Sequence, residues 1–434
     1  MRHGALVAAT ISGLLGLGLG PAVAAADEPG VTLAAAGDIA CRPTFSFGAT
    51  TCHQAGTAAL IRQLAPTAVA ALGDNQYEQG ALSDYMASFH PTWGAFKSLI
   101  RPVPGNHEYY MPGAAGYYSY FGGAAGDPTQ GYYSYDLGSW HVLALNSNCG
   151  FVACDIGSAQ EQWVRADLAA HPNVCTLAYW HHPVFGSGGG SGRMSQIWQT
   201  LSESKVDVVL TGHNHNYERF AAQDGRGRPD VVRGIRQFVV GTGGADLTPQ
   251  LGVAPNSEVR DSSSFGVLLL RLEPGAYEWR FHSENTGFGD AGRDVCHDKT
   301  PPRMRSLSLG TRAFRALGRG RSLSGGGAGA LLRYRLSEPA SVAFAVERAR
   351  PGRRRGPECA PSRRPQPVRL RCTRWIALPG GFARQSPAGR SRTRFTGRVG
   401  GRRLPPGRYR LSAVATDAAQ NVSSTSRTGF RIAR

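Results

Sequence analysis

Short hydrophobic runs in the first part of the chain alternate with longer stretches that have the spacing of helices. Four runs lead into a polar motif, and they cover residues 31–36, 67–72, 177–180 and 206–210. Candidate helices lie between the runs, at residues 54–64, 158–170 and 194–202. Strands that alternate with helices are typical of α/β proteins, so the pattern predicts an α/β fold.

The pattern changes after residue 212, where the hydrophobic runs follow one another as strands. These runs lie at residues 236–240, 266–272 and 277–282. A sheet must bury its apolar face against another layer. We therefore expect these strands to complete a second sheet that packs on the first.

Polar motifs follow the carboxyl ends of the predicted strands. In chain order they read Gly37-Asp38, Gly73-Asp74-Asn75-Gln76-Tyr77, Gly105-Asn106-His107-Glu108, His181-His182-Pro183 and Gly212-His213-Asn214-His215. Open α/β sheets bring such loops together along one edge. The ordered set supplies ligands for two metal ions, an arrangement that serves the hydrolysis of phosphate esters. Asp38 and Asp74 could instead be turn or helix-cap residues, the usual role of aspartate after a strand.

The amino terminus has the features of a cleaved secretory signal. Arg2 and His3 precede an apolar, glycine-rich run at residues 5–20, and small residues follow it up to Ala26. These features predict a signal peptide over residues 1–26 and a mature protein that is secreted or associated with the cell surface. A retained signal anchor is the alternative, although glycines interrupt the run and it barely reaches spanning length. No other segment is expected to cross a bilayer.

Charge divides the chain into two unlike parts. The 434 residues carry a net charge of +18, but residues 1–300 contain 18 Lys plus Arg and 26 Asp plus Glu, which gives −8. Residues 301–434 contain 30 Arg, no Lys and 4 acidic residues, which gives +26. A Pro-rich joint at residues 298–302 lies between the two parts, and such joints separate domains. We predict a catalytic domain over residues 27–298 and a basic domain over residues 299–434.

The basic region has the pattern of a small all-β sandwich. Its apolar runs, at residues 331–336, 341–346, 409–415 and 428–432, are separated by Gly, Pro and Arg. The excess of Arg could attract an anionic cell-wall polymer, a membrane surface or nucleic acid. A coding bias toward Arg that produced a basic spacer is the alternative. We find no recognisable nucleic-acid-binding fold in this region and predict no specific nucleic-acid partner.

The eight cysteines agree with export, because an even number suits a compartment that allows disulfides. Their spacing suggests three local pairs, which are Cys41–Cys52, Cys149–Cys154 and Cys359–Cys372. Cys175 would then pair with Cys296 by elimination. A free buried thiol is the alternative for Cys175, which lies in an apolar strand. No cysteine pair has the C-x-x-C spacing of a zinc knuckle, so we expect no thiolate metal site.

The motifs resemble those of the calcineurin-like metallophosphoesterase superfamily and, within it, the purple acid phosphatases. The resemblance covers roughly residues 31–297. Many members have Asp-x-His at the first motif, but this chain has Asp38-Ile39-Ala40, and Ala40 cannot bind a metal. Purple acid phosphatases use a tyrosine three residues after the bridging aspartate, which is the position of Tyr77. The stretch from Gly212 to Arg219 is also similar to the Gly-His-x-His-x-Tyr-Glu-Arg stretch of plant-type members.

The resemblance implies both a fold and a set of site residues. The fold would be a β-sandwich flanked by helices (α-β-β-α). One metal would be held by Asp38, Tyr77 and His215, and the other by Asn106, His181 and His213, with Asp74 bridging the two. A tyrosinate at Tyr77 favours Fe(3+) at the first position, and the second ion would be Zn(2+), Fe(2+) or Mn(2+). His107 would protonate the leaving alcohol, because it follows a ligand and is not needed as one.

Three further assignments have a second interpretation. We assign His182 and Tyr217 to substrate binding, but His182 could equally hydrogen-bond its neighbours, and Tyr217 could cap the following turn. Tyr77 could be packed in its loop rather than bound to a metal.

The sequence therefore predicts an exported binuclear metallohydrolase, most simply an acid phosphatase that acts on phosphomonoesters. A phosphodiesterase or phospholipase-type enzyme with the same metals is one alternative. A surface-binding protein, in which the basic C-terminal module dominates function, is the other. That module resembles the immunoglobulin-like or fibronectin-like modules appended to secreted bacterial enzymes, with residues 413–421 close to their last-strand ending. The oligomeric state is not predicted.

Overall fold

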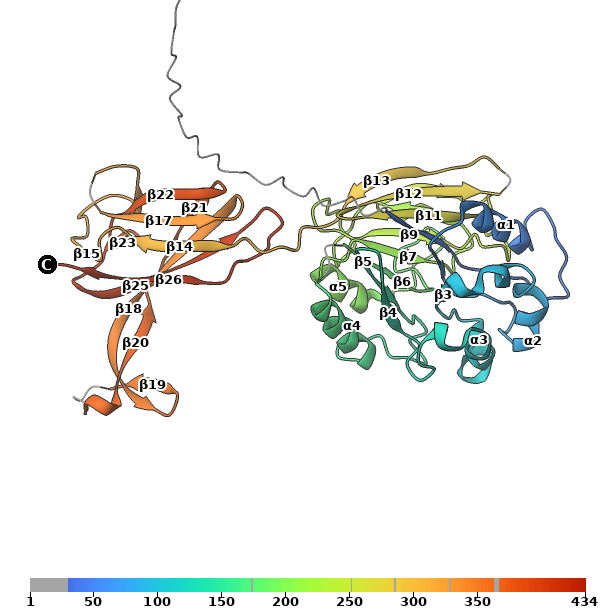
Figure 1. The fold of residues 1–434 in the computed structure, drawn as a ribbon, viewed down its shortest axis with the longest axis horizontal. Coiled ribbons are helices and arrows are strands. Elements are labelled where there is room, and N and C mark those ends of the chain that lie inside the picture. The colour runs from blue at the N-terminus through green and yellow to red at the C-terminus, as the bar shows by residue number, and fades with distance from the viewer. Residues whose placement is uncertain (1–29, 173–174, 251, 285, 328, 363–366) are drawn as a thin grey trace, which may run out of the picture.

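The computed structural model describes residues 30–172, 175–250, 252–284, 286–327, 329–362 and 367–434. The signal peptide predicted for residues 1–26 lies outside this range. Figure 1 shows a larger lobe of sheets and helices and a smaller lobe of strands. Among the described residues, no helix has the length and the apolar character needed to cross a membrane.

One sheet of the larger lobe combines parallel strands from the start of the region with antiparallel strands from its end. Parallel pairing joins β1 to β2 and β2 to β3, while β11 pairs with β1 in the antiparallel direction. The order across the sheet is β13 (Ala291–Val295), β12 (Ala276–Ser283), β11 (Gly266–Glu273), β1 (Val31–Ala36), β2 (Ala68–Ala71) and β3 (Ile100–Pro102).

The second sheet has a parallel centre formed by β5, β6, β7 and β9. Its order is β10 (Ser257–Asp261), β8 (Tyr217–Phe220), β9 (Arg236–Val240), β7 (Val208–Thr211), β6 (Cys175–Tyr179), β5 (Trp140–Ala144) and β4 (Tyr133–Leu137). The strands after residue 212 were expected to complete one second sheet. They divide instead between both sheets, because β8, β9 and β10 extend the second sheet whereas β11, β12 and β13 extend the first.

Three helices flank the sheets: α1 (Gln54–Leu64), α4 (Ala159–Ala170) and α5 (Ser195–Glu203). Each lies within one residue of its predicted range. Figure 1 shows α1 beside the first sheet and α4 and α5 beside the second. Ser158 caps α4, since its side chain accepts the N–H of Glu161. Shorter helical segments between β2 and β4 are α2 (Leu82–Asp84), α3 (Ala115–Phe121) and turns at Tyr85–Phe89, Trp93–Leu99, Glu108–Tyr110, Pro112–Ala114 and Gly122–Ala125.

The central strands β5, β6 and β7 of the second sheet bury both of their faces. Leu177 of β6 and Leu210 of β7 belong to the core between the sheets, together with Leu33 and Val267 of the first sheet. Val209 belongs to a separate buried cluster that contains residues of α4 and α5. Neighbouring residues of a strand face opposite sides, so burial on both sides requires the continuous apolar runs seen in the sequence. The predicted α/β class, with two packed sheets between helices, is confirmed.

The C-terminal region is all-β, as predicted. One sheet has the order β14 (Met304–Leu309), β17 (Ala330–Leu336), β22 (Gly389–Phe395) and β16 (Leu323–Ser324). The other has the order β15 (Ala313–Phe314), β26 (Ser426–Ile432), β25 (Gly407–Thr416), β18 (Ala340–Arg355) and β19 (Glu358–Pro361), and β20 (Arg371–Ala377) and β21 (Phe382–Ser386) also pair with β18. A short hairpin joins β23 (Arg398–Val399) to β24 (Arg402–Arg403), and a helical turn covers Val368–Leu370.

The C-terminal sheets enclose a hydrophobic core of their own. Leu332, Phe344, Leu411 and Phe430 are buried in one cluster that contains no residue of the larger lobe. This separation is the property expected of a domain. The boundary at residue 298 lies between β13 and β14 and remains a prediction, as does the likeness to immunoglobulin-like modules.

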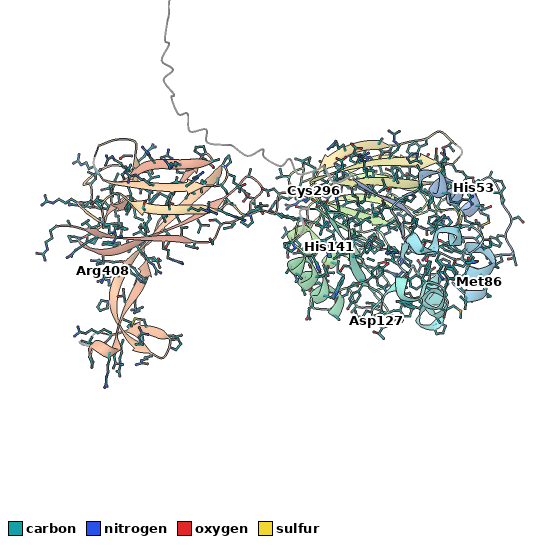
Figure 2. The ribbon with its side chains drawn as sticks, viewed as in Figure 1. His53, Met86, Asp127, His141, Cys296 and Arg408 are labelled. Carbon is teal, nitrogen blue, oxygen red and sulfur yellow. A yellow bond between two sulfur atoms is a disulfide. The ribbon has the colours of Figure 1, made fainter. Side chains whose placement is uncertain are left out.

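Four disulfides are present, and they are the four pairs suggested by the sequence: Cys41–Cys52, Cys149–Cys154, Cys175–Cys296 and Cys359–Cys372. Cys175 begins β6 of the second sheet, whereas Cys296 directly follows β13 of the first sheet. Figure 2 shows Cys296 at the edge of the larger lobe that faces the C-terminal strands. This disulfide therefore ties the two sheets of the larger lobe together.

Candidate metal centre

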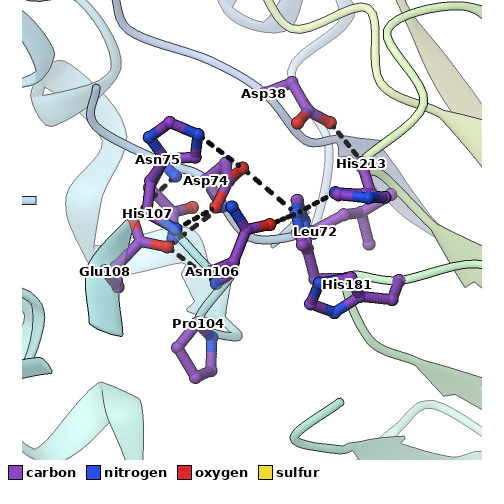
Figure 3. Close-up of polar contacts among 12 residues, drawn as sticks. Asp38, Leu72, Asp74, Asn75, Pro104, Asn106, His107, Glu108, His181 and His213 are labelled. Carbon is purple, nitrogen blue, oxygen red and sulfur yellow. Dashed lines mark hydrogen bonds and ion pairs between the residues drawn. The ribbon is translucent and has the colours of Figure 1, made fainter. Parts of the chain in front are cut away.

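Loops from both sheets meet at the carboxyl ends of the parallel strands. They bring together all seven predicted metal ligands: Asp38 after β1, Asp74 and Tyr77 after β2, Asn106 after β3, His181 after β6, and His213 and His215 after β7. Figure 3 shows Asp38, Asp74, Asn106, His181 and His213 of this set. The convergence follows from strand order, because each polar motif begins where a buried strand ends.

Three of these side chains form a first group. The Tyr77 hydroxyl donates to Asp38 Oδ1 at 2.9 Å and lies 2.8 Å from His215 Nε2. His215 Nε2 lies 3.1 Å from Asp38 Oδ1, which closes the triangle. Ligands bound to one ion at about 2.0–2.2 Å must lie about 3 Å from one another, so these spacings fit a shared ion.

Three other side chains form a second group. His181 Nε2 lies 3.2 Å from Asn106 Oδ1 and 3.2 Å from His213 Nδ1. Ring nitrogens and an amide oxygen with these spacings again suit one ion.

Asp74 lies between the two groups and contacts both. Its Oδ2 accepts the Tyr77 hydroxyl at 3.2 Å and lies 3.2 Å from His181 Nε2. A single carboxylate that reaches both sets of ligands is the arrangement a bridging residue requires. The residues present therefore fit two neighbouring cations.

Three of the candidate ligands adopt left-handed backbone conformations that are uncommon for residues other than glycine. The φ angles are 58° at Asp38, 46° at Asp74 and 69° at His213. Such conformations cost roughly 1–3 kcal/mol each and persist only where the surroundings enforce them. At Asp38 the enforcement is visible, since its Oδ2 accepts the backbone N–H of His213 at 2.8 Å.

Glu108 is a residue whose role the sequence did not reveal. Its buried carboxylate accepts four backbone N–H groups, from Gly105 at 2.7 Å, Asn75 at 2.8 Å, Asp74 at 3.0 Å and Gln76 at 3.3 Å. It also accepts the hydroxyl of Tyr85 at 2.9 Å. These bonds join the loop that carries Asp74 to the loop that carries Asn106. The only signal in the sequence was the place of Glu108 at the end of the third motif.

Two outer contacts orient imidazole ligands. His181 donates Nδ1–H to the carbonyl of Leu72 at 2.9 Å, which leaves Nε2 free to bind a cation. His215 Nδ1 lies 2.7 Å from Asp246 Oδ1, a carboxylate that was not singled out from the sequence. Contacts of this kind fix the tautomer of a metal-binding histidine and raise its basicity.

Burial and the neighbouring charges shift the pKa values of the side chains in this cluster. Burial alone would raise the pKa of Asp74, but the neighbouring His181 lowers it below the usual range of a carboxyl. Burial lowers the pKa of His213 to about 4, and His181 adds to that effect. Burial, and then the carboxylates of Asp38 and Asp74, raise the pKa of Tyr77 well above its ordinary value. A strongly charged cation at the first group would reverse the balance at Tyr77.

His107 faces the cluster from the third motif. Its backbone N–H donates to Asp74 Oδ1 at 2.9 Å, and its Nε2 lies 3.8 Å from Asp74 Oδ2. Its Nδ1–H donates to the carbonyl of Glu78 at 2.6 Å. The ring therefore presents Nε2 to the centre and is held by its other nitrogen, as a proton donor requires.

The two residues assigned to substrate binding lie in different places. His182 is buried, its Nδ1 lies 2.8 Å from the hydroxyl of Ser147, and it can share an ion-sized space with His181 and His213. Burial, with the positive His181, lowers the pKa of His182 to about 2. Tyr217 is fully buried, and its hydroxyl donates to Asp290 at 2.7 Å, so the structure does not bring it to the cluster.

A pocket of about 380 Å³ opens beside the first group of ligands. It is lined by Tyr77, His107 and His215 and by the loop that the Cys41–Cys52 disulfide closes, with Arg42 and Phe45, and by Glu78 and Asp246. The guanidinium of Arg42 lies 5.0 Å from the centre of the Phe45 ring and 3.3 Å from Glu78. The pocket thus joins the candidate metal centre to solvent through a partly aromatic wall.

Comparisons with known proteins agree with this geometry. The family model of the calcineurin-like phosphoesterases matches residues 32–217. Purple acid phosphatase 22 of Arabidopsis thaliana is 29% identical over 233 residues, which cover 46% of this chain and 52% of that protein. Purple acid phosphatase 18 of the same plant is 26% identical over 265 residues, which cover 52% of this chain and 59% of that protein. The chain thus spans about half the length of the curated relatives it matches.

A solved structure supports the same fold. Purple acid phosphatase PPD1 from yellow lupin (Lupinus luteus) seeds matches 62% of this chain and 54% of its own, with a TM-score of 0.52 and 18% sequence identity. Residues 32–217 therefore match the calcineurin-like phosphoesterases, a binuclear metal-dependent family, and the chain is similar to the purple acid phosphatases.

Proposed function

We propose that this protein is an exported acid phosphatase that hydrolyses phosphomonoesters. The observation that carries the proposal is the position of Asp74, which contacts Tyr77 of one ligand group and His181 of the other. Export is supported by the four disulfides, which form and persist in oxidising compartments.

Each ligand group would hold one metal ion. Asp38, Tyr77 and His215 would hold the first, Asn106, His181 and His213 the second, and Asp74 would bind both. The hard, anionic oxygen of Tyr77 would favour Fe(3+) at the first position, and the second would take Zn(2+), Fe(2+) or Mn(2+). When bound, two such ions supply Lewis acidity and a nucleophile at neutral or acid pH.

The remaining residues would manage the proton and the phosphate. His107 Nε2 faces the centre and would donate a proton to the leaving alcohol, while the carbonyl of Glu78 holds its other nitrogen. His182 would hydrogen-bond a phosphate oxygen, while its Nδ1 is held beside the hydroxyl of Ser147.

Metal content and visible absorption of the Tyr77→Phe variant test the proposal. We expect the mature protein to contain two metals, to be coloured by a tyrosinate-to-iron band, and to lose that band in the variant. Tyr217→Phe is the matched control, because it removes a buried hydroxyl that lies away from the cluster. Two metals without colour, unchanged by Tyr77→Phe, would contradict iron at the first position. Faster cleavage of a phosphodiester than of a monoester would favour the phosphodiesterase or phospholipase-type alternative.

We also propose that the C-terminal region holds the enzyme near an anionic cell-wall or membrane surface. Its support is the positive charge of residues 301–434, which contain 30 Arg and only 4 acidic residues. If this attachment were the main function, a protein without residues 301–434 would no longer be retained at the surface, although it would still hydrolyse phosphate esters in solution.

A further inference from the structure

The outer face of the sheet β14-β17-β22 carries five arginines in a regular array. They are Arg305 of β14, Arg333 and Arg335 of β17, and Arg390 and Arg392 of β22, and all five are exposed. The inner face of the same strands is apolar, with Leu332 and Tyr334 buried in the core. Because side chains alternate along a strand, the arginines that lie between the buried residues must share one outer face.

The strand register places these arginines directly opposite one another. Arg335 pairs with Arg305 on one side and with Arg390 on the other, so three guanidinium groups follow each other across three strands. Arg333 pairs with Arg392 two residues further along. Adjacent strands lie about 4.8 Å apart, and like charges directly opposite one another destabilise a sheet.

In the part of the chain that the structure describes, no acidic side chain offsets this charge locally. Among the described residues, none of the five guanidinium groups has a carboxylate within ion-pair distance. Two shallow grooves run between the arginines: one of about 370 Å³ next to Arg305 and Arg335, and one of about 350 Å³ next to Arg333, Arg390 and Arg392. Anionic groups of a ligand can therefore enter the spaces between the arginines.

The chemistry of the face favours a particular class of anion. The exposed large apolar side chains among the described C-terminal residues are Val368, Ile376 and Val422. None of them lies on this face, so the described face offers no anchor for a bilayer. Among the described residues of these three strands, the aromatic side chains Tyr334 and Phe395 are buried in the core, so this face offers no platform for stacking a base. A thin polymer that is recognised through its phosphates alone meets both conditions.

We propose that this arginine face binds a linear phosphodiester polymer without bases, of the poly(glycerol phosphate) type. The proposal rests on the proposed attachment through the C-terminal region but not on the phosphatase activity. The phosphates would lie in the two grooves beside these arginines. Each phosphate would neutralise guanidinium groups that otherwise repel one another.

The test compares the full mature protein with two double variants. Arg333→Ser with Arg392→Ser removes one opposed pair from the face. Arg408→Ser with Arg431→Ser is the matched control, because these arginines are also exposed and directly opposite one another but lie on the other sheet. Figure 2 shows Arg408 on the surface of the C-terminal lobe. The readouts are binding of poly(glycerol phosphate) as a function of salt, and the phosphatase activity of each variant.

We expect the first double variant to bind about tenfold more weakly at low salt and to lower the salt slope by about 1.4, with the control unchanged. Equal losses in both variants would mean that attachment depends on total charge, and would overturn the assignment to this face. No binding by the wild type would overturn the attachment itself.

Two further probes decide the class of partner. A base-bearing oligonucleotide with the same number of phosphates should bind no more tightly than poly(glycerol phosphate). Tighter binding of the oligonucleotide, or binding only to vesicles of anionic phospholipid, would overturn the proposal. Phosphatase activity should stay at the wild-type level throughout, since neither pair lies near the metal centre.

Discussion

The carboxylate of Glu108 accepts the backbone N–H of Asp74 at 3.0 Å, so the residue that contacts both ligand groups is positioned by a buried anion from the neighbouring loop. Burial, and then the charge of Asp74, raise the pKa of Glu108 above the usual range of a carboxyl. The bonds from four backbone N–H groups act in the opposite direction, because they favour the ionised form.

Replacing Glu108 by Gln should loosen the metal centre without touching a ligand. An amide brings an NH₂ group to a site where every partner is a donor, so at least one backbone N–H must lose its acceptor. We expect metal affinity to fall about 10- to 100-fold and the free energy of unfolding to fall by roughly 1–3 kcal/mol. Metal titration and chemical denaturation measure the two effects. Glu203→Gln, at an exposed helix end, is the control. Wild-type metal affinity in Glu108→Gln would contradict the role of Glu108 in positioning the ligand loops.

The site ligands could be predicted from the sequence because their positions depend on local pattern. Asp38, Asp74 and His181 each follow a continuous apolar run, and parallel strands end at the same edge of a sheet. Chain order therefore determined which loops would meet. The resemblance to purple acid phosphatases added the assignment of Tyr77, which composition alone would leave as one loop tyrosine among several.

Other features depend on packing that a single sequence does not display. The carboxylates of Glu108 and Asp246 act through partners on other loops, so their roles appear only once the loops are placed. Tyr217 follows the last motif closely, yet the strand β8 turns its side chain toward Asp290. The predicted strand at 341–346 continues to Arg355, because pairing with β20 extends it beyond the apolar pattern.

Loss of the Cys175–Cys296 disulfide should destabilise the larger lobe far more than loss of Cys149–Cys154. The two bonds close loops with sequence separations of 121 and 5 residues. In the chain-entropy model these correspond to about 5 and about 2 kcal/mol of the free energy of unfolding. Double Cys→Ser variants of each pair, compared by denaturant unfolding, measure the difference. Equal losses would contradict the role of Cys175–Cys296 in tying the two sheets together.

A buried histidine should make stability depend on pH. His141 lies 2.7 Å from Asp167 and 2.8 Å from Asp136, and its ring stacks on His171 at 4.3 Å. Burial opposes the protonation of His141, but the two carboxylates raise its pKa. Burial likewise opposes the ionisation of Asp167, but the hydrogen bond to His141 lowers its pKa. The raised pKa of His141 stabilises the fold fully at pH values below the pKa of the unfolded histidine, which is about 6.5. This stabilisation is lost as the pH rises through the pKa of His141 in the folded protein. The lowered pKa of Asp167 stabilises the fold at pH values above the pKa of an unfolded aspartate, which is about 3.9. This stabilisation is lost as the pH falls through the pKa of Asp167 in the folded protein.

We therefore expect His141→Gln to cost most between about pH 4 and 6.5 and least at alkaline pH. The loss in the free energy of unfolding should be about 1.5–3 kcal/mol at its largest, as for hydrogen bonds to charged groups. Denaturation of both proteins at pH 5.5 and pH 9 measures it. His90→Gln is the control, because His90 bonds the hydroxyl of Tyr120 rather than a carboxylate. A pH-independent loss in His141→Gln would rule out a charged histidine.

The pocket beside His107 should select the leaving group of the phosphate ester. Its wall contains the half-exposed ring of Phe45, while the carboxylates of Glu78 and Asp246 would repel an additional phosphate. We predict that Phe45→Ala lowers kcat/KM for phenyl phosphate about tenfold relative to glycerol 2-phosphate, because an aromatic contact is lost. Phe47→Ala is the matched control, since Phe47 lies in the same loop, packs on His53 and does not line the pocket. Affinity for benzylphosphonate should fall in parallel, whereas affinity for methylphosphonate should not. If Phe45→Ala lowers both substrates equally, the ring supports the loop and does not contact the leaving group.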